Sequence, residues 1–479
     1  MAIRKTSIKP SPFPEPKPPG LTVLILAAGV GKRMHSRASK LVHNLAGKPM
    51  VRYVVDAALA VGAQRVLVVV GSESEEVRQA VGTKDPKVSF CIQEQPLGTG
   101  HAVLSAEKTL KGVEDTLLIL NGDLPSLRVE TLHALLEFHR LHSVPLTLLT
   151  AVLEDPAAYG RIIRNYNSDV ARIVEASDAT PEEKQIQEIN AGIYCVEMKH
   201  LFKNLLQASA NNAQGEVYLT DLVEILKRNH QKVAAYRHPD SEEVMGVNNR
   251  RELARAGKRL YLRKARELMD SGVTLLDPEC TYVEANVRVG RDTVLCPMTF
   301  LVGDTVLGES CWVGPGTRIS NSVVGAESEI LDHCVITQAR LGKGVKVGPF
   351  AHLRPDTELA EGVRIGNFVE IKKTAIGRGS KANHLTYLGD SEIGEGVNIG
   401  AGTITCNYDG EKKHKTVVED GVFVGSDSQL VAPVKVRKGS YVGAGSTITK
   451  EVPPYSLAIA RGRQVVVKGW ARKHRKKQH

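Results

Sequence analysis

The sequence is poor in aromatic residues and lacks the features of secreted or membrane proteins. Aromatic side chains make up only 5% of its 479 residues. Its seven cysteines are odd in number and no two have CxxC spacing, so we expect neither a disulfide framework nor a zinc site. No run approaches the ~18 apolar residues that a membrane-spanning helix needs. We therefore expect a cytoplasmic protein without membrane insertion.

Neither terminus resembles a folded domain. Residues 1–20 are rich in proline and lack the apolar core of a signal peptide, so they are expected to form a disordered extension. The net charge is +10, and part of it lies in the basic tail Lys468–His479. We interpret that tail as a solvated, frayed terminus and expect no nucleic-acid partner. Substrates that carry phosphates explain the remaining positive charge better.

The first half of the chain alternates between strand-like and helix-like segments. Apolar runs typical of buried strands, and amphipathic runs typical of helices, follow each other at Leu21–Ala27, Met50–Ala60, Arg65–Val70, Glu73–Val81 and Thr116–Leu120. This order predicts a Rossmann-like α/β domain over residues 21–248, with a parallel sheet covered by helices on both faces. Leucines at helical spacing then predict a long linker helix over residues 249–270.

From residue 271 to residue 479 the sequence has a different period. Aliphatic residues recur every six positions, with occasional steps of five, at Val289, Leu295, Leu301, Leu307, Val313, Ile319, Val324, Ile330, Ile336, Leu341, Val347, Leu353, Leu359, Ile365 and Ile371, and again at Val418, Val424, Leu430, Val436, Val442 and Ile448. A period of six fits neither a helix nor an ordinary strand. It fits a left-handed parallel β-helix with one hexapeptide on each of three faces and 18 residues in each coil.

A glycine-rich turn follows the first predicted strand. The segment Ala28-Gly29-Val30-Gly31-Lys32-Arg33-Met34 lets the backbone approach a phosphate. It is not a Walker A loop, because Arg33 stands where Ser or Thr is required, and Met34 replaces the third glycine of the dinucleotide fingerprint. Alone, the turn is equally compatible with a plain tight turn.

Three further features favour a nucleotide site in this domain. Lys40 follows the turn within reach of the same phosphates. Gln93 and the segment Gly98-Thr99-Gly100-His101-Ala102 offer an amide and an open backbone to a base. Asp123 lies just past a buried strand, where α/β sheets bind ligands, and in this setting we interpret it as a Mg²⁺ ligand rather than as a turn residue.

The run from Leu26 to Met34 resembles the signature of sugar-nucleotide pyrophosphorylases. With the hexapeptide region, the chain from about Leu21 to Trp470 is similar to the bacterial bifunctional N-acetylglucosamine-1-phosphate uridylyltransferase / glucosamine-1-phosphate acetyltransferases. The resemblance implies an enzyme that acetylates glucosamine-1-phosphate with acetyl-CoA and then couples N-acetylglucosamine-1-phosphate to UTP. The product, UDP-N-acetylglucosamine, would supply the synthesis of peptidoglycan and lipopolysaccharide.

The same resemblance assigns roles in the first domain. Arg33 and Lys40 would bind the triphosphate as catalytic cations, and Asp123 and Asn248 would hold Mg²⁺. The remaining nucleotide- and sugar-binding positions would be Leu26, Ala27, Ala28, Gly29, Gln93, Gly98, Thr99, Asn121, Gly122, Gly160, Glu175 and Asn190. Two positions depart from the family pattern, namely Asn121, where Tyr is frequent, and Ser39, where Pro is usual.

In the second domain, the residues themselves suggest acyl transfer. His384 lies inside the repeat, and a base of near-neutral pKa is what acetylation of an amine requires. Arg354 and Lys372 are 18 residues apart and should stack on adjacent coils, an arrangement that an anion such as a sugar phosphate would stabilise. The spacing of Tyr387 is also expected to bring it near His384 on adjacent coils. The segment Thr405–Lys413 interrupts the hexapeptides, as loops that serve a site often do.

The resemblance completes this second site. Asn398 would join Arg354, Lys372 and Tyr387 around glucosamine-1-phosphate, with His384 as the base. Acetyl-CoA would contact Ala401, Asn407, Tyr408, Ser426, Ala444 and Arg461. The resemblance also implies a homotrimer. Two alternatives remain, namely a single-function pyrophosphorylase with a regulatory β-helix, and a hexapeptide scaffold with an inactive first domain.

Overall fold

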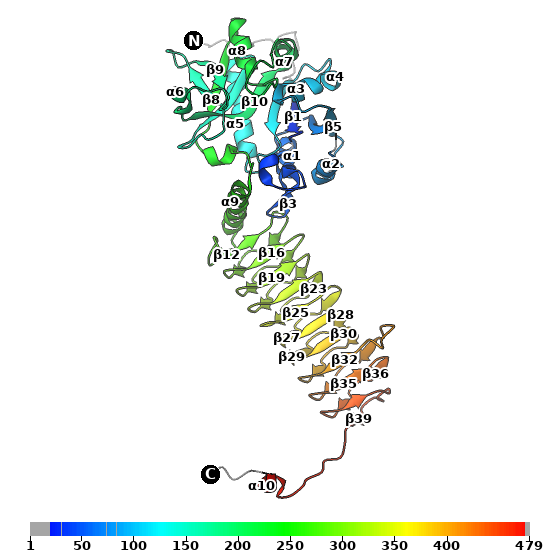
Figure 1. The fold of residues 1–479 in the computed structure, drawn as a ribbon. Helices are drawn as coiled ribbons and strands as arrows, with labels where there is room; N and C mark the ends of the chain where they lie inside the picture. Colours follow the sequence, from blue (N-terminus) through cyan, green and yellow to red (C-terminus); the bar gives the residue numbers. More distant parts are fainter. Residues whose placement is uncertain (1–19, 30, 73, 83, 475–479) are drawn as a thin grey trace, which may run out of the picture. The chain divides into compact units, whose positions relative to one another are not determined.

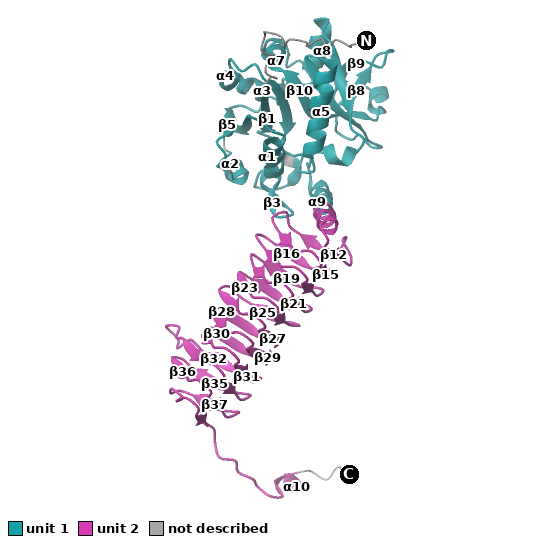
Figure 2. Cartoon of the chain, turned by 180° about the vertical axis from the view of Figure 1, so that it is seen from behind, with its two compact units in different colours: residues 1–259 teal, residues 260–479 magenta. Residues whose placement is uncertain are grey.

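The computed structural model describes residues 20–474 except residues 30, 73 and 83. They form two compact units, which divide between Arg259 and Leu260 (Figures 1 and 2). The proline-rich extension predicted for residues 1–20 lies, apart from Gly20, outside the described residues. In the described part of the chain, no helix has both the length and the apolar character needed to cross a membrane.

Unit 1 contains a nine-stranded sheet with the order β11-β7-β10-β6-β1-β4-β5, to which the hairpin β8–β9 is attached through β10. Its strands are β1 (Leu21–Ala27), β4 (Arg65–Gly71), β5 (Val88–Gln93), β6 (Thr116–Asn121), β7 (Leu146–Val152), β8 (Arg161–Arg164), β9 (Val170–Val174), β10 (Glu188–Glu197) and β11 (Val233–Arg237). A separate small hairpin pairs β2 (Asn44–Leu45) with β3 (Lys48–Pro49).

Helices cover both faces of this sheet (Figure 1). They are α1 (Met50–Ala60), α2 (Glu75–Val81), α3 (Thr99–Ser105), α4 (Glu107–Leu110), α5 (Val129–His142), α6 (Pro181–Lys184), α7 (Met198–Leu205) and α8 (Asp221–Arg228), with 3-10 turns η1 (Lys32–Met34), η2 (Lys40–Val42) and η3 (Ser241–Val244). Leu24 of β1 shares a core with residues of α3, α7 and α8. Its neighbours Val23 and Ile25 point to the other face and are fully buried as well. The Rossmann-like α/β architecture is thus confirmed.

The sheet is mixed, whereas the alternating pattern predicts a purely parallel one. The central strands β6, β1, β4 and β5 are parallel. Strand β10 lies antiparallel between β6 and β7, and β8 and β9 form an antiparallel hairpin. Antiparallel neighbours need no crossover helix. The residues before β10 form the hairpin β8–β9 and the short helix α6. Strands in this part of the sheet are therefore not separated by long helices, whereas the parallel strands earlier in the chain are.

The long helix α9 (Arg250–Asp270) runs across the division between the two units. Its first half belongs to unit 1. In its second half, Ala265 and Leu268 are buried in the core of unit 2.

Unit 2 is a parallel β-helix whose coils each contribute one short strand to each of three faces (Figure 1). The first face, an 11-stranded sheet, contains β12 (Thr274–Leu275), β15 (Val294–Leu295), β18 (Trp312–Val313), β21 (Glu329–Ile330), β24 (Lys346–Val347), β27 (Arg364–Asn367), β29 (Lys381–His384), β31 (Asn398–Ile399), β34 (Phe423–Val424), β37 (Tyr441–Val442) and β39 (Leu457–Ala458).

The other two faces belong to one 17-stranded sheet that continues around a corner. The second face contains β13 (Tyr282–Val283), β16 (Phe300–Val302), β19 (Arg318–Ser320), β22 (Val335–Thr337), β25 (His352–Leu353), β32 (Ile404–Cys406), β35 (Gln429–Val431) and β38 (Thr447–Ile448). The third contains β14 (Arg288–Val289), β17 (Val306–Leu307), β20 (Val323–Val324), β23 (Ala339–Leu341), β26 (Thr357–Leu359), β33 (Thr416–Val418) and β36 (Val434–Val436). Strands β28 (Glu370–Ile376) and β30 (Tyr387–Ile393) span both faces. A short helix, α10 (Trp470–His474), follows the coils.

The hexapeptide prediction is confirmed along this unit. The aliphatic residues of the predicted repeat form one continuous core, and all of them are buried except Val289, which is partly exposed. Strands pair in parallel with the strand about one coil later, as Tyr282 pairs with Phe300. The coil that contains the predicted insertion is longer, because Ile404 pairs with Gln429. The extra residues leave the coil as a loop between β32 and β33.

Candidate active sites

In unit 1, the candidate site forms where parallel strands end. Strands β1 and β6 pair in register, so that Leu26 lies beside Asn121. The amide of Gly122 then donates to the carbonyl oxygen of Leu26 at 2.9 Å. Because parallel strands end at the same edge of the sheet, the glycine-rich turn after β1 and Asp123 after β6 lie side by side.

Lys40, Asp123 and Asn248 meet at this edge. The ammonium of Lys40 forms an ion pair with Oδ2 of Asp123 and donates to Oδ1 of Asn248 at 3.0 Å. One cation therefore reaches both oxygens, although Asn248 lies 125 residues after Asp123 in the chain. A carboxylate and an amide oxygen are hard ligands that suit Mg²⁺. Among the described residues, no cluster of three or more His, Cys, Asp or Glu side chains could hold a metal alone, so a Mg²⁺ ion here would need phosphate oxygens and water as further ligands.

The segment that carries Asn248 is fixed beside Asp123 by backbone hydrogen bonds. Val247 donates to the carbonyl oxygen of Asp123 at 3.0 Å, and Gly246 donates to the hydroxyl of Tyr159 at 2.9 Å. Burial raises the pKa of Tyr159 to about 12, with a further increase from Asp123, so the phenol stays neutral. The Arg33 guanidinium is close enough to oppose that increase. Arg33 thus lies within electrostatic range of Tyr159.

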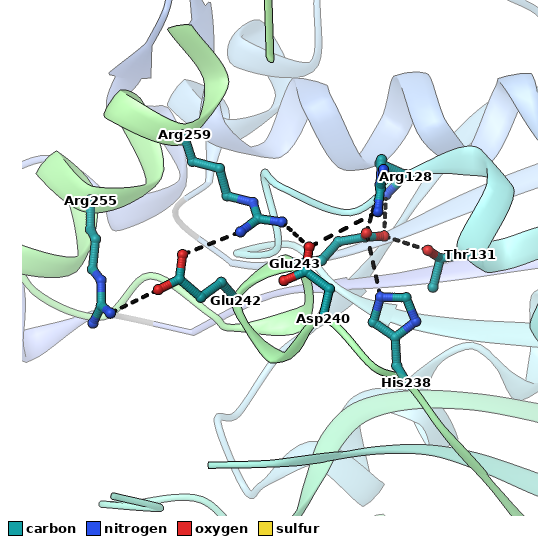
Figure 3. Close-up of polar contacts among 8 residues, drawn as sticks. All are labelled: Arg128, Thr131, His238, Asp240, Glu242, Glu243, Arg255 and Arg259. Carbon is teal, nitrogen blue, oxygen red and sulfur yellow. Dashed lines mark hydrogen bonds and ion pairs between the residues drawn. The ribbon is translucent and has the colours of Figure 1, made fainter. Parts of the chain in front are cut away.

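A buried carboxylate anchors the start of the same segment (Figure 3). Glu243 of η3 is fully buried. It accepts from the backbone amide of Arg128 at 3.0 Å, from Nε of Arg128 at 2.7 Å and from the hydroxyl of Thr131 at 2.5 Å, and it lies 3.4 Å from Nε2 of His238. Burial alone would raise the pKa of Glu243, but the contacts from His238, Thr131 and Arg128 outweigh it and lower the pKa to about 2. Glu243 therefore ties η3 to the start of α5.

The predicted nucleotide residues line a cavity of about 530 Å³ at this edge. Its lining includes Leu26, Ala28, Gly29, Lys40, Gln93, Gly98, Thr99, Asn121 and Asp123. Ala27 lines an adjoining cavity of about 350 Å³, which also contains Ala28, Gly29 and Gln93. Val30 of the glycine-rich turn lies outside the described residues. The structure thus brings together residues from five separate segments of the sequence.

The predicted sugar residues form a group of their own. Asn190 donates through its backbone amide to the carbonyl of Gly160 at 2.9 Å, and a Cβ on Gly160 would lie 3.4 Å from Oε2 of Glu175. Burial raises the pKa of Glu175, while the hydroxyl of Thr220 donates to it at 3.1 Å and opposes that shift. The side chain of Asn190 donates to the Tyr194 hydroxyl at 2.6 Å.

Asn121 connects this group to the nucleotide cavity. Its amide lies against Gly192, which has φ +71°, and a Cβ at Gly192 would come within 2.2 Å of Nδ2 of Asn121. The backbone amide of Gly192 in turn donates to Oδ1 of Asn190 at 3.1 Å. The departure from the family pattern at Asn121 therefore lies between the two predicted subsites, where it contacts the strand that carries Asn190.

In unit 2, one corner of the β-helix carries a row of candidate residues on successive coils. Asn367 pairs with His384 in register. The next coils align Ala382 with Ile399, Val424 and Val442, which places Ala401, Ser426 and Ala444 below His384. Backbone bonds at the corner follow the same ladder, as in the 2.7 Å bond from Asp427 to the carbonyl of Ala401. At its end, Arg461 donates through Nη1 to the carbonyl oxygen of Ala444 at 2.7 Å.

This row contains four of the six residues predicted to contact acetyl-CoA, namely Ala401, Ser426, Ala444 and Arg461. Their three small side chains leave the corner open next to His384. Asn398 lies three residues before Ala401 and pairs with Lys381 on the preceding coil. Asn407 and Tyr408 lie elsewhere, in the loop after β32. There Asn407 donates to a carboxylate oxygen of Asp390, and the Tyr408 hydroxyl donates to the carbonyl of Gly410.

A cluster of cations occupies the next face of the same coils. The pairing of Leu353 with Ile371 places Arg354 and Lys372 on adjacent coils, as the 18-residue spacing predicts. Arg354 forms a 2.7 Å ion pair with Glu370. Lys413 and, to a lesser extent, Arg354 lower the pKa of Lys372, because each positive charge disfavours the next. The Tyr387 hydroxyl lies over Gly389, which pairs with Lys372.

Lys413 is a candidate residue to which the sequence reasoning gave no role. It belongs to the insertion Thr405–Lys413, which the sequence marks as a site loop, but no spacing rule places a loop residue against Lys372. Its proximity to Lys372 depends on the fold of this loop, in which Lys413 forms an antiparallel bridge with Tyr408. The three positive charges of Arg354, Lys372 and Lys413 make this face a candidate phosphate site.

His384 and the cation cluster lie on either side of one corner. His384 ends β29, and the chain turns at Leu385 before Tyr387 begins β30. The imidazole of His384 forms a 3.0 Å hydrogen bond with Asn367. Among the described residues, no hydrogen bond links this imidazole to Arg354 or Lys372. It also lines a surface cavity of about 650 Å³ with Asn367 and Asn383.

Comparisons with known proteins match each of the two units to a different family model. Residues 23–181 match the model of the MobA-like NTP transferase domain, and residues 339–373 match that of the bacterial transferase hexapeptide (six repeats). The chain is 48% identical to "Bifunctional protein GlmU" of Geobacillus sp. (strain WCH70), over 92% of this chain and 95% of the relative. It is 50% identical to the protein of that name from Carboxydothermus hydrogenoformans, over 92% of this chain and 98% of the relative. The Pelobacter propionicus protein of the same name is 48% identical, over 95% and 99%.

Proposed function

Since the chain belongs to the GlmU family of bifunctional proteins, we propose that each of its two candidate sites catalyses one of two consecutive transfers. The chain acetylates glucosamine-1-phosphate with acetyl-CoA, and it transfers UMP from UTP to N-acetylglucosamine-1-phosphate, giving UDP-N-acetylglucosamine and pyrophosphate. The observation that carries this proposal is the presence of both sites in one chain that matches bifunctional relatives over nine-tenths of its length. A single-function pyrophosphorylase and an inactive scaffold, the two alternatives, each leave one of these sites without a role.

We assign uridylyl transfer to residues 21–248. The 530 Å³ cavity holds the nucleotide, with Gln93, Gly98 and Thr99 at the base and Arg33 and Lys40 at the phosphates. Gly160, Glu175 and Asn190 hold the sugar. A phosphate oxygen of the sugar attacks the α-phosphorus of UTP, the bond to the bridging oxygen breaks, and pyrophosphate leaves. Arg33 and Lys40 orient the phosphates and stabilise the charge that develops on their oxygens.

Asp123 and Asn248 are proposed to hold Mg²⁺. The contact of Lys40 with both side-chain oxygens supports this assignment, because it shows that a single cation is within reach of both. When bound, the ion would neutralise phosphate oxygens and orient the triphosphate. A bound ion would share these two oxygens with the Lys40 ammonium, which would then be available to contact a phosphate.

We assign acetyl transfer to residues 271–479. The amine of glucosamine-1-phosphate attacks the thioester carbonyl, His384 takes the proton that the amine loses, and the bond from carbon to sulfur breaks. The CoA thiolate that leaves then receives a proton, which gives free thiol. Arg354, Lys372, Tyr387 and Asn398 hold the sugar phosphate, and Lys413 adds a third positive charge to that site. Acetyl-CoA lies along Ala401, Ser426, Ala444 and Arg461, with Asn407 and Tyr408 at its edge.

The proposal includes a homotrimer in the cytoplasm. Apolar rings support an assembly, because the exposed side chains of Phe350 and Phe368 stack at 5.3 Å between ring centroids along the corner that carries His384, and exposed Leu385 follows them. Exposed apolar rows of this kind favour association. A neighbouring subunit at this corner would bring further groups to His384 and the cation cluster.

The test separates the two activities in the purified full chain. Thiol release from acetyl-CoA with glucosamine-1-phosphate should be lost in His384→Ala, while pyrophosphate release from UTP with N-acetylglucosamine-1-phosphate persists. Asp123→Ala should show the reverse. Wild-type protein that lacks either activity, or a variant that loses both while it stays folded, would contradict the two-site assignment.

A further inference from the structure

The amide of Gln93, at the end of β5, is held by two neighbours from one short segment. Its nitrogen Nε2 lies 3.1 Å from the carbonyl oxygen of Gly98 and 3.1 Å from Nδ1 of His101. Gln93 is only 5% exposed, and it lines both cavities at the nucleotide site. His101 itself has no part in the roles assigned above.

These two contacts fix which atom of the amide faces the cavity. A backbone carbonyl can only accept, so the atom of Gln93 that faces Gly98 must be the nitrogen. One amide proton then goes to Gly98 and the other to His101, whose Nδ1 must accept and whose ring proton therefore lies on Nε2. Both donors are used. Oε1 has no hydrogen-bond donor among the described residues, and it is the amide atom that remains for a ligand.

The segment that holds Gln93 is itself rigidly placed. The carbonyl of Gly98 also accepts from the amide of Ala102 at 3.1 Å, the first turn of α3. Two backbone hydrogen bonds of 2.8 Å join the residues around Gly98 to Val217: the amide of Val217 donates to the carbonyl of Leu97, and the amide of Gly100 donates to the carbonyl of Val217. Gly98 has φ +102°, and a Cβ there would lie 2.6 Å from the carbonyl oxygen of Val217. The carbonyl of Gly98 therefore cannot shift to suit a different base, and it keeps one amide proton of Gln93 engaged.

We propose that His101 is a positioning residue that sets the nucleobase specificity of this site, because it occupies the second amide proton of Gln93 and leaves only an acceptor for the base. The inference rests on the proposed nucleotidyl transfer and deepens it. Uracil presents an N3–H donor, which suits Oε1. Cytosine has no proton on N3, so a cytosine in the same position would place the lone pair of N3 against the lone pairs of Oε1 of Gln93. Sites built around one hydrogen-bonding pattern reject the opposite pattern strongly.

Two substitutions at His101 separate this role from simple packing. His101→Leu keeps an apolar side chain of similar reach but removes the acceptor, so that one proton of Gln93 becomes available to the base. His101→Asn can place its own carbonyl oxygen near the position of Nδ1 and so restore the acceptor. Neither variant touches the proposed phosphate or metal residues.

The measurement is the ratio of kcat/KM for UTP to that for CTP, read as pyrophosphate release with N-acetylglucosamine-1-phosphate. We expect His101→Leu to lower this ratio at least about tenfold, mainly through a higher KM for UTP, while His101→Asn stays within about threefold of wild type. An unchanged ratio in His101→Leu overturns the proposal, and so does an equal loss in both variants.

Calorimetric titration of the full chain with UTP and with CTP gives an independent reading of the same preference. If wild-type protein binds UTP more tightly than CTP but releases no pyrophosphate, the proposed reaction fails while the base-selecting role of His101 can still be scored in the two variants. Wild-type protein that binds both nucleotides equally overturns the inference. A circular dichroism signal at 222 nm and a thermal unfolding midpoint like those of wild type show that unit 1 is intact in each variant.

Discussion

His384 and Asn367 lie in register on adjacent coils of the β-helix and are joined by a 3.0 Å hydrogen bond between Nδ1 of the imidazole and Oδ1 of the amide. An amide oxygen can only accept, so Nδ1 carries a proton, and in the neutral imidazole the lone pair is then on Nε2. That is the form a general base needs. The bond also fixes the plane of the ring, as the partners of catalytic and metal-bound histidines commonly do.

Substitution of Asn367 should slow acetyl transfer without abolishing it. Asn367→Leu removes the acceptor, so the ring can rotate and the tautomer with the proton on Nε2 becomes accessible. We expect kcat for thiol release to fall about tenfold with a small change in KM, and His384→Ala to lose nearly all activity. Asn367→Asp, which keeps an acceptor, should retain turnover with an altered pH profile. Wild-type kcat in Asn367→Leu would show that His384 is oriented by other means.

The effect of Lys413 on the pKa of Lys372 predicts a role for the inserted loop in phosphate binding. Lys413→Ala removes the charge that lowers the pKa of Lys372 most. It also removes one cation from the site, so KM for glucosamine-1-phosphate should rise about tenfold and depend less steeply on salt. Lys412→Ala is the matched control, because it removes an exposed lysine from the same loop. Equal effects of the two variants would mean that net loop charge, rather than Lys413, matters.

Asp123 and Asn248 should differ in their effect on metal dependence. Asp123→Ala removes the charged ligand, and we expect pyrophosphate release to fall by at least about a hundredfold at any Mg²⁺ concentration. Asn248→Ala removes a neutral ligand, so activity should recover as Mg²⁺ is raised. Electron paramagnetic resonance of Mn²⁺ bound to the UTP complex provides a check that needs no turnover. Metal affinity should fall more in Asp123→Ala than in Asn248→Ala. A Mg²⁺ titration that is unchanged in Asn248→Ala would remove this residue from the metal site.

The sequence predicts elements well where one local rule decides the structure. The hexapeptide period places the aliphatic core of unit 2 correctly because each residue has a single possible direction, into the bore. Helix α1 has the predicted bounds, Met50–Ala60. The antiparallel placement of β10 was missed, since strand direction depends on which neighbours it joins and no pattern within Glu188–Glu197 records that choice.

Contacts between distant segments were beyond sequence reasoning for the same reason. The position of Asp123 past a buried strand is visible in the sequence, whereas the approach of Asn248 depends on the path of the whole segment between them. The stacking of Arg354 on Lys372 follows from an 18-residue spacing. The position of Lys413 depends on the path of a loop, and that of His101 depends on a side-chain rotamer. Neither follows a periodic pattern, so the sequence shows which residue types are present but not where their side chains lie.

The buried Glu243 predicts how unit 1 responds to acid (Figure 3). Its pKa is about 2 in the folded chain, against an ordinary value of 4.5. A lowered folded pKa stabilises the fold fully above the unfolded value, so this stabilisation should be present above about pH 4.5 and lost as the pH falls toward 2. Its size corresponds to about 3 kcal/mol at neutral pH. Circular dichroism at 222 nm reports this unit, because it contains most of the helices.

Glu243→Gln should therefore destabilise unit 1 at pH 7 by about 2–4 kcal/mol, since it leaves the Arg128 guanidinium without its buried partner. It should also flatten the loss of stability between pH 4.5 and pH 3. Glu242→Gln is the matched control. Its carboxylate is 48% exposed and pairs with Arg255 at 2.8 Å and with Arg259 at 3.2 Å, so it should cost less than about 1 kcal/mol. Because η3 leads directly to Gly246 and Asn248, Glu243→Gln should also raise the Mg²⁺ concentration needed for half-maximal pyrophosphate release. A variant that is destabilised but has an unchanged Mg²⁺ requirement would show that the anchor supports the fold alone and not the metal ligand.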